Sequence, residues 1–364
     1  MRGAFQGLDL SQVWDSHAHI AGVGDSPSGI QLNPRMNSKL HPAHFVRRLF
    51  FLNAGCAYAP EGQSIDVAYV RRMLLLMDGM RRGCKLVLFA FERTYGEDGK
   101  ADPDRTAFHV PDGYARELAR ENPRYFEWAC SIHPYRRDCV EALEQAKKDN
   151  ARAVKWLPAS MGIDPASPLC DRFYEAAARL RIPVITHAGM ERAVLGAEQQ
   201  DFGNPLRLRR ALDAGVRIVV AHCASMGEDR DTDKGPNGPM VDSFELFSRL
   251  MDEKRYEKNL YGDISAITQI KRAHCVGKVI EREDWHPRLL NGSDYPLPGI
   301  MPIFSVEYLV SLGLVQESAR DLLTTIREYN PLIFDFVLKR HLRSNGKALS
   351  NSVFETRRFF EAAA

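Results

Sequence analysis

Three polar side chains alternate with other residues in the segment VWDSHAHI, residues 13–20, and all three can bind a metal ion. Asp15, His17 and His19 stand at every second position, and residues two apart on a β-strand point to the same face of a sheet. Two imidazoles and a carboxylate on one face suit a divalent metal such as Zn²⁺. The segment is equally compatible with a strand whose histidines only form hydrogen bonds, so the rest of the chain must distinguish the two interpretations.

More residues of this kind occur near the C-terminal ends of other expected strands. Short apolar or β-branched runs predict eight strands, at residues 13–20, 84–91, 125–134, 152–158, 182–189, 216–223, 260–266 and 288–296. The candidate site residues lie near the ends of the first, fourth, fifth, sixth and eighth of these: His17, His19, Lys155, His187, His222 and Asp294. Histidines of an ordinary core have no reason to select one end of several strands, so this placement favours a metal site.

Amphipathic helices alternate with the expected strands. Apolar residues recur every three or four positions at residues 66–82, 113–122, 140–149, 170–181, 205–215 and 243–254. The alternation predicts an α/β fold, a TIM (β/α)₈ barrel, in which the C-terminal ends of the strands meet at one rim. A doubly wound open sheet is the alternative, but no GxGxxG sequence follows the first strand. We expect residues 1–364 to form one domain, with a barrel core at about 13–340 and a C-terminal extension at 341–364.

Three long connections follow expected strands, at residues 21–63, 93–112 and 224–240. In a barrel they would lie at the rim that carries the C-terminal strand ends, where long loops shape a binding site. The C-terminal extension contains VFETRRFF, residues 353–360. This segment could pack across the barrel or onto a second subunit of a homodimer.

Five sequence pieces carry a resemblance to a known group of enzymes: DSHAHI, VKWLP, PVITHAG, VVAHCA and NGSDYP, in that order between residues 13 and 296. The series resembles the amidohydrolase superfamily of metal-dependent barrels. The nearer match is its amidohydrolase-related branch, which includes enzymes similar to aminocarboxymuconate-semialdehyde decarboxylase. The HxH pair alone is a weak signal, whereas HxH followed by histidines and an aspartate at later strand ends is a strong one.

The resemblance implies a role for each candidate residue. His17, His19 and His187 match metal ligands, and Asp294 matches an aspartate that contacts the metal and handles a proton. His222 matches a histidine that binds a second metal in some members and contacts substrate or water in others. Lys155 matches a lysine that bridges two metals once carboxylated; otherwise it is a lysine that holds a substrate carboxylate or pairs with an acid.

The resemblance and the residue chemistry together predict a metal-dependent hydrolase. One or two divalent ions, in the first place Zn²⁺, would lower the pKa of a bound water to about 7, and Asp294 would transfer its proton. The substrate would be a small molecule with an ester, lactone or amide bond. Non-oxidative decarboxylation of a small unsaturated or aromatic carboxylic acid is the alternative, and a non-catalytic metal-binding barrel is a second alternative.

Other polar residues have a simpler interpretation beside the functional one. Asp15 either orients a ligand or ties down its strand, and His133, at the end of the third strand, reads better as a core or loop histidine. Arg93 and Arg192 follow strands and could clamp a carboxylate, but surface ion pairs are the better interpretation.

Composition excludes several classes of function. The 49 basic and 47 acidic residues give a net charge of +2, so nothing indicates nucleic acid or an anionic membrane surface as a partner. The sequence contains no run of 18 apolar residues, so it predicts no membrane span. The N-terminus does not resemble a signal peptide. The seven cysteines include no CxxC pair, which indicates reduced thiols and a cytoplasmic location.

Overall fold

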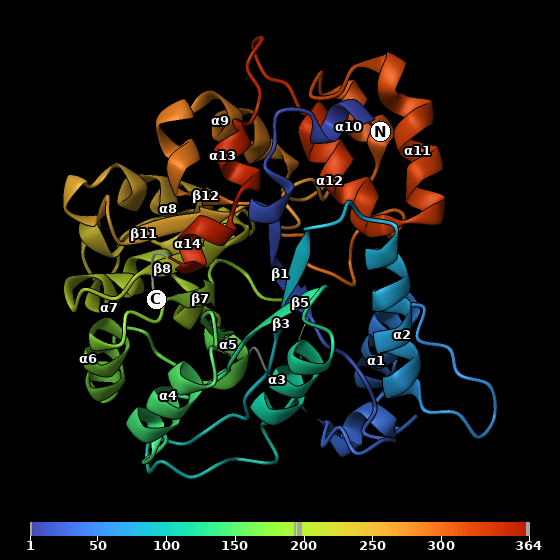
Figure 1. The fold of residues 1–364 in the computed structure, drawn as a ribbon. Helices are drawn as coiled ribbons and strands as arrows, with labels where there is room; N and C mark the ends of the chain where they lie inside the picture. The colour runs from blue at the N-terminus through green and yellow to red at the C-terminus, as the bar shows by residue number, and fades with distance from the viewer. Residues whose placement is uncertain (1, 193, 195–198, 362–364) are drawn as a thin grey trace.

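Eight parallel strands form the centre of the protein in the computed structural model, which describes residues 2–192, 194 and 199–361. They are β1 (Trp14–His19), β3 (Lys85–Phe89), β5 (Phe126–Ala129), β6 (Val154–Trp156), β7 (Val184–His187), β8 (Ile218–Ala221), β11 (Leu260–Asp263) and β12 (Leu289–Leu290) (Figure 1). Each lies inside one of the eight predicted runs and is shorter than that run. The eight predicted strands are therefore confirmed.

The strands close into a ring. One sheet has the order β1-β3-β5 and the other has the order β12-β11-β8-β7-β6. A parallel bridge between Cys130 and Val154 joins β5 to β6. At the other seam, the His19 N–H donates to the Tyr295 carbonyl and the Asp294 N–H donates to the His17 carbonyl, both at 2.8 Å. The predicted TIM barrel is confirmed.

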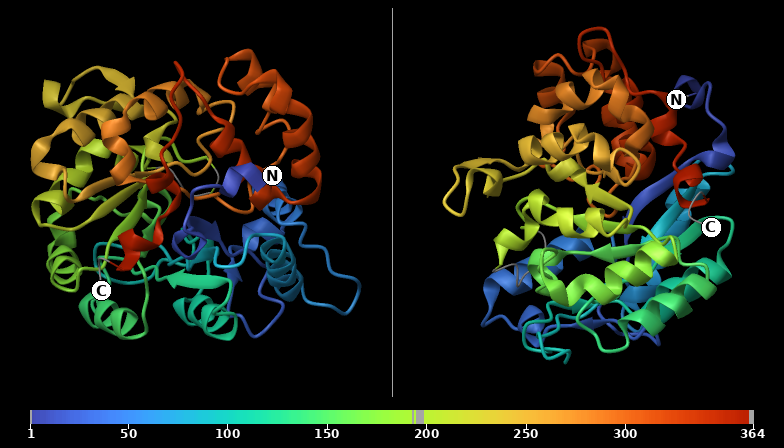
Figure 2. Two further views of the ribbon diagram at one scale, coloured as in Figure 1. Left: turned by 45° about the horizontal axis from the view of Figure 1, so that its top comes forward. Right: turned by 90° about the vertical axis from the view of Figure 1, so that its left-hand side faces the viewer.

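Helices surround the strands (Figure 2). The six predicted amphipathic segments form helices at α2 (Ile65–Asp78), α3 (Asp112–Glu121), α4 (Cys139–Lys148), α6 (Asp171–Arg179), α7 (Arg209–Asp213) with the 3₁₀ turn before it, and α8 (Ser243–Asp252). Capping determines where α2 begins, because the Ser64 side chain accepts a hydrogen bond from the Val67 N–H. Later parts of the chain add α9 (Val276–Glu281), α10 (Val306–Ser311), α11 (Arg320–Tyr329) and α12 (Pro331–His341). None of the described helices is long and apolar enough to cross a membrane.

The long connections carry structure of their own at the rim. Residues 21–63, expected as a connection without a helix, contain α1 (Pro42–Ala54). This helix leaves apolar side chains such as Val46 and Leu49 exposed. Two short antiparallel pairs join other rim segments: β2 (Gln31–Leu32) with β4 (Phe108–His109), and β9 (Glu228–Arg230) with β10 (Met240–Asp242). One further short helix, α5 (Pro158–Met161), follows β6.

The C-terminal extension packs across its own barrel, at the end opposite the C-terminal ends of the strands. It forms α13 (Asn351–Phe354) and α14 (Arg357–Glu361), and α14 lies beside β1 (Figures 1 and 2). Phe359 and Phe360 are buried in one apolar cluster with Trp14 at the start of β1 and with residues that point into the barrel. The Phe360 ring stacks on Trp14 with centroids 5.9 Å apart. The extension therefore seals the N-terminal end of the barrel, and a homodimer stays an untested prediction.

Candidate metal centre and active-site cavity

All six predicted site residues line one cavity at the C-terminal ends of the strands. The cavity has a volume of about 520 Å³. His17 and His19 come from β1, Lys155 from β6 and His187 from the last position of β7; the other two, His222 and Asp294, directly follow or lie close after β8 and β12. The structure thus places these residues together, while their roles as ligands stay a prediction.

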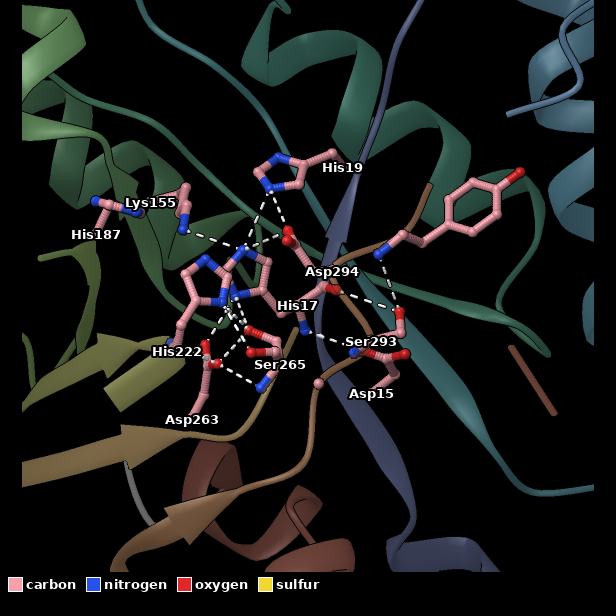
Figure 3. A network of polar contacts seen from close by, with 12 residues as sticks. Asp15, His17, His19, Lys155, His187, His222, Asp263, Ser265, Ser293 and Asp294 are labelled. Carbon is pink, nitrogen blue, oxygen red and sulfur yellow. Dashed lines mark hydrogen bonds and ion pairs between the residues drawn. The ribbon is translucent and has the colours of Figure 1, made fainter. Parts of the chain in front are cut away.

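The ring nitrogens of β1 and the carboxylate of Asp294 form the centre of the group (Figure 3). The Nε2 atoms of His17 and His19 are 3.2 Å apart. Asp294 Oδ1 lies 3.2 Å from His19 Nε2 and 3.5 Å from His17 Nε2. Ligand atoms of His17, His222 and Asp294 all lie within 4.8 Å of one another. Donor atoms from three separated parts of the sequence therefore face one point.

Asp263, at the end of β11, orients the His17 ring, and the sequence analysis assigned it no role. Its Oδ2 lies 2.7 Å from His17 Nδ1, and both side chains are fully buried. Its Oδ1 accepts hydrogen bonds from the backbone N–H groups of His222 and Ser265, at 3.0 and 2.8 Å. When Nδ1–H donates to the carboxylate, the lone pair of a neutral imidazole is on Nε2. The His17 lone pair then points toward His19 and Asp294.

His222 is oriented in the same manner by a backbone carbonyl. Its Nδ1 lies 2.9 Å from the carbonyl oxygen of Ser265, so an Nδ1–H donor leaves the Nε2 lone pair available. Burial lowers the pKa of both His17 and His222 well below the ordinary value, and the neighbouring Lys155 lowers that of His17 further. Both rings are therefore neutral near pH 7, which is the form that binds a metal.

The backbone adopts a strained conformation where His222 leaves β8. His222, Cys223 and Ala224 have φ values of 55°, 51° and 51°, in the left-handed region that such residues seldom occupy. Strain of this kind is concentrated at functional sites, where the surrounding structure maintains it. The Cys223 thiol points away to the Asp263 carbonyl and its pKa is raised well above the ordinary value by burial, so it is not a nucleophile here.

Asp294 is positioned by the close approach of the last barrel segment to β1. A Cβ atom at Gly292 would lie 2.6 Å from the Cβ of His17, so only glycine fits there. The half-buried carboxylate of Asp15 accepts hydrogen bonds from the N–H groups of His17 and Ser293, at 3.0 and 2.8 Å. Asp15 therefore ties its strand to the segment that carries Asp294.

His187 and Lys155 lie at the side of this centre (Figure 3). The Nε2 of His187 is 3.3 Å from Oε2 of Glu191, a buried residue of the following loop for which sequence reasoning had no signal. Burial lowers the pKa of His187 to about 4. Lys155 is 1% exposed, its Nζ lies 3.2 Å from His17 Nε2, and burial lowers its pKa to about 8.

The arrangement fits a divalent metal ion. His17 and His222 are neutral and have their Nδ1 atoms engaged by acceptors, which leaves Nε2 lone pairs facing a carboxylate oxygen. Imidazole nitrogen and carboxylate oxygen are the ligands that Zn²⁺ and related ions prefer. The hydrogen-bonded partners behind the rings are those that metal-binding histidines ordinarily have.

The structure also places the other polar residues that the sequence singled out. His133 accepts the Tyr135 N–H at Nδ1 and donates from Nε2 to the Met161 carbonyl, so it is a core histidine. Arg93 bonds Gln31, whereas Arg192 lines the cavity and is exposed. Asp263 could have been found, because it too is a polar residue at a strand end.

Comparison with known proteins agrees with this description. The sequence profile of the amidohydrolase family matches residues 14–299. No curated protein matches the sequence significantly. Several crystal structures share the fold, among them an uncharacterized TIM-barrel protein from Bordetella bronchiseptica, with a TM-score of 0.52 and 14% identity over 89% of this chain and 99% of that one.

Two other similar structures are enzymes. A 5-carboxyvanillate decarboxylase from Novosphingobium aromaticivorans has a TM-score of 0.48 and 10% identity, over 89% of this chain and 96% of that one. A 4-oxalomesaconate hydratase from Rhodopseudomonas palustris has a TM-score of 0.46 and 14% identity, over 89% and 97%. The TM-scores of these two structures are below 0.5, so neither similarity supports a conclusion about this chain. The family profile, however, covers more than half of the sequence, and the chain therefore belongs to the amidohydrolase family and is an enzyme.

Proposed function

We propose that this enzyme hydrolyses an ester, lactone or amide bond of a small molecule with the help of a divalent metal ion. The observation that carries the proposal is the convergence of His17 Nε2, His19 Nε2 and Asp294 Oδ1 within 3.5 Å of one another. A cavity of about 520 Å³ is of the size that small ligands occupy.

His17, His19, His222 and Asp294 would hold the ion, and His187 would contribute if it left Glu191. A divalent ion held by these residues supplies Lewis acidity, which lowers the pKa of a coordinated water and polarises a carbonyl oxygen. Zn²⁺ is the first ion to test because the donors are imidazoles and a carboxylate. The ligand atoms gather at one point, so we expect one metal equivalent per chain.

Asp294 would accept the proton of the attacking water and deliver it to the leaving group. Its carboxylate contacts two ring nitrogens that cannot serve as bases while they bind a metal. It also faces the cavity, where a substrate would sit. If the ion were held without His222, this residue would be the second group to contact water or substrate, because its Nε2 is not engaged by Ser265.

Non-oxidative decarboxylation is the second candidate, and the apolar lining of the cavity favours it. The walls include Phe50, Phe51, Phe91, Phe108 and several aliphatic side chains. A carboxylate loses its hydration in such surroundings, which helps the loss of CO₂. In that reaction Asp294, when protonated, would deliver the proton to carbon.

Product analysis distinguishes the two reactions. The full-length chain, loaded with Zn²⁺ or Mn²⁺, is assayed with aryl esters, lactones, amides and aromatic acids in isotopically labelled water. Hydrolysis places one labelled oxygen in the acid product and releases no CO₂, whereas decarboxylation releases CO₂. Metal analysis of the same samples should give about one equivalent per chain; two equivalents would favour a carboxylated Lys155 that bridges two ions.

A further inference from the structure

Arg272 is a buried cation that forms no close ion pair with the described part of the chain. The residue is 5% exposed. Its Nη1 is 3.3 Å from Ser225 Oγ, and its Nε has no hydrogen-bond partner. Among residues 2–192, 194 and 199–361, no carboxylate oxygen lies within 4.0 Å of its guanidinium.

Such a group is costly to maintain unless an anion completes it. A guanidinium stays charged at any ordinary pH, and burial of a charge is unfavourable without a hydrogen-bonded partner of opposite charge. Burial lowers the pKa of the Arg272 side chain, although the charges of Asp294 and Glu191 act in the opposite direction from a distance. In a site that binds an anion, the bound anion would offset the unfavourable free energy of burying this guanidinium.

The place of Arg272 in the fold indicates where that anion would come from. The side chain lines the same cavity as His17 and Asp294. Among the described residues, the other cations that line the cavity are Lys155 and four residues nearer the surface, Arg47, Arg48, Arg192 and Lys271, and the lining carboxylates are Glu191 and Asp294. A basic entrance attracts anions by long-range electrostatics, and the remaining walls are mostly apolar.

We propose that Arg272 is a specificity-determining residue that binds a carboxylate group of an otherwise apolar substrate. The planar guanidinium presents paired N–H donors that match the two oxygens of a carboxylate, and the Ser225 hydroxyl beside it can donate one more hydrogen bond. A phosphate dianion ordinarily requires more donors than one guanidinium and one hydroxyl. The proposal deepens the proposed function and rests on it, because it names the class of substrate for the same cavity.

In hydrolysis the carboxylate bound by Arg272 would anchor the molecule and remain in the product, while the reacting ester, lactone or amide lies at the metal centre. The substrate would then be an acid with a second, hydrolysable group. Arg272 would act as a positioning residue in this case, and its loss should raise KM more than it lowers kcat.

Binding of an unreactive probe tests the proposal without turnover. The probes are 4-phenylbutanoate and the neutral 4-phenylbutanamide, measured by titration calorimetry with the full-length protein, both metal-free and loaded with Zn²⁺. We expect the acid to bind at least tenfold more tightly than the amide in both forms. Arg272→Gln should abolish this preference, Arg272→Lys should retain part of it, and the matched control Arg71→Gln, an exposed residue of α2 outside the cavity, should retain all of it.

Three outcomes would overturn the proposal: equal affinity for acid and amide, a preference that survives in Arg272→Gln, or a preference seen only with Zn²⁺ bound and insensitive to Arg272. Thermal unfolding monitors folding of each variant, and Arg272→Gln should melt near the wild-type temperature, because it removes a buried charge that has one long hydrogen bond and no close ion pair among the described residues. Failure of the hydrolase proposal would appear as absent turnover with the probe preference intact. The two failures are therefore distinguishable.

Discussion

The carboxylate of Asp263 and the Nδ1 atom of His17 are 2.7 Å apart, and neither side chain has any exposed surface. One residue ends β11 and the other lies in β1, so this contact exists only because the barrel closes. It orients the one ring that contacts His19, Asp294 and Lys155 at once.

Replacement of Asp263 by asparagine should weaken metal binding while the enzyme stays folded. The amide oxygen can still accept hydrogen bonds from the N–H groups of His222 and Ser265. However, the amide has no negative charge to keep the proton on Nδ1 of His17. Loss of such a partner costs about ten- to a hundredfold in metal affinity. Competition titration with a chromophoric chelator measures the change. Unchanged affinity would mean that the contact serves only folding; Asp321→Asn, at a 92% exposed position, is the matched control.

The two histidines His17 and His187 should differ in their effect on metal content. His17→Ala removes the nitrogen at the centre of the donor group, and we expect nearly all bound metal to be lost. His187→Ala should cost less, because the His187 Nε2 lies beside Glu191 and outside the group of three whose ligand atoms lie within 4.8 Å of one another. Elemental analysis after dialysis gives the stoichiometry. Equal loss of metal in both variants would show that His187 contributes as much to metal binding as His17 does.

Asp294→Asn should separate metal binding from proton transfer. The amide oxygen keeps a neutral donor at the same place but cannot accept a proton near pH 7. We expect much of the metal and the fold to remain, and kcat to fall by about a hundredfold or more, as is usual for loss of a general acid–base. Steady-state kinetics on the substrate found in the product assay provide the measurement. Turnover at the wild-type rate would transfer the proton role to His222.

Stability should decrease in mild acid because of His133. Burial lowers the pKa of this histidine to about 3, whereas the unfolded chain has the ordinary value of about 6.5. The unfolded state therefore binds the proton first as the pH falls. The contribution to stability is complete above about pH 6.5 and is lost toward pH 3, at about 1.4 kcal/mol per pH unit.

Comparison with His133→Gln isolates this effect. Glutamine stays neutral and can keep both hydrogen bonds, so the difference in unfolding free energy between wild type and variant should shift by roughly 2 kcal/mol between pH 7 and pH 5 in favour of the variant. Urea unfolding at the two pH values measures it. The same substitution at the exposed His41 is the control, and a pH-independent difference at His133 would contradict the prediction.

Truncation of Phe360 should destabilise the barrel from the end opposite the active site. Its ring is 2% exposed and stacks on Trp14. Phe360→Ala should lower the unfolding free energy by about 3 kcal/mol, the usual cost of deleting a buried phenyl ring. Denaturant unfolding measures the loss, and Tyr329→Ala, at a 77% exposed aromatic, should change stability little. A loss no larger than that control would show that the extension is not part of the cooperative fold.

The sequence by itself determined the barrel and the group of residues at its rim. The alternation of Asp15, His17 and His19 marks β1, and the helical period marks α6 because one face of that helix is buried. His17, His187 and His222 were recognisable because parallel strands of a closed barrel bring their C-terminal ends together, whatever the separation in sequence. Asp263 obeys the same rule and could have been predicted from it.

Only the tertiary structure decided the contacts that depend on loops and on packing between distant segments. Nothing local brings Glu191 to His187 or Arg272 into the cavity, because loop conformations follow from the elements that the loops pack against. The sequence shows that the apolar C-terminal segment should be buried, but it does not show which surface buries it. Only the shape of the barrel end brings Phe360 onto Trp14 of the same chain.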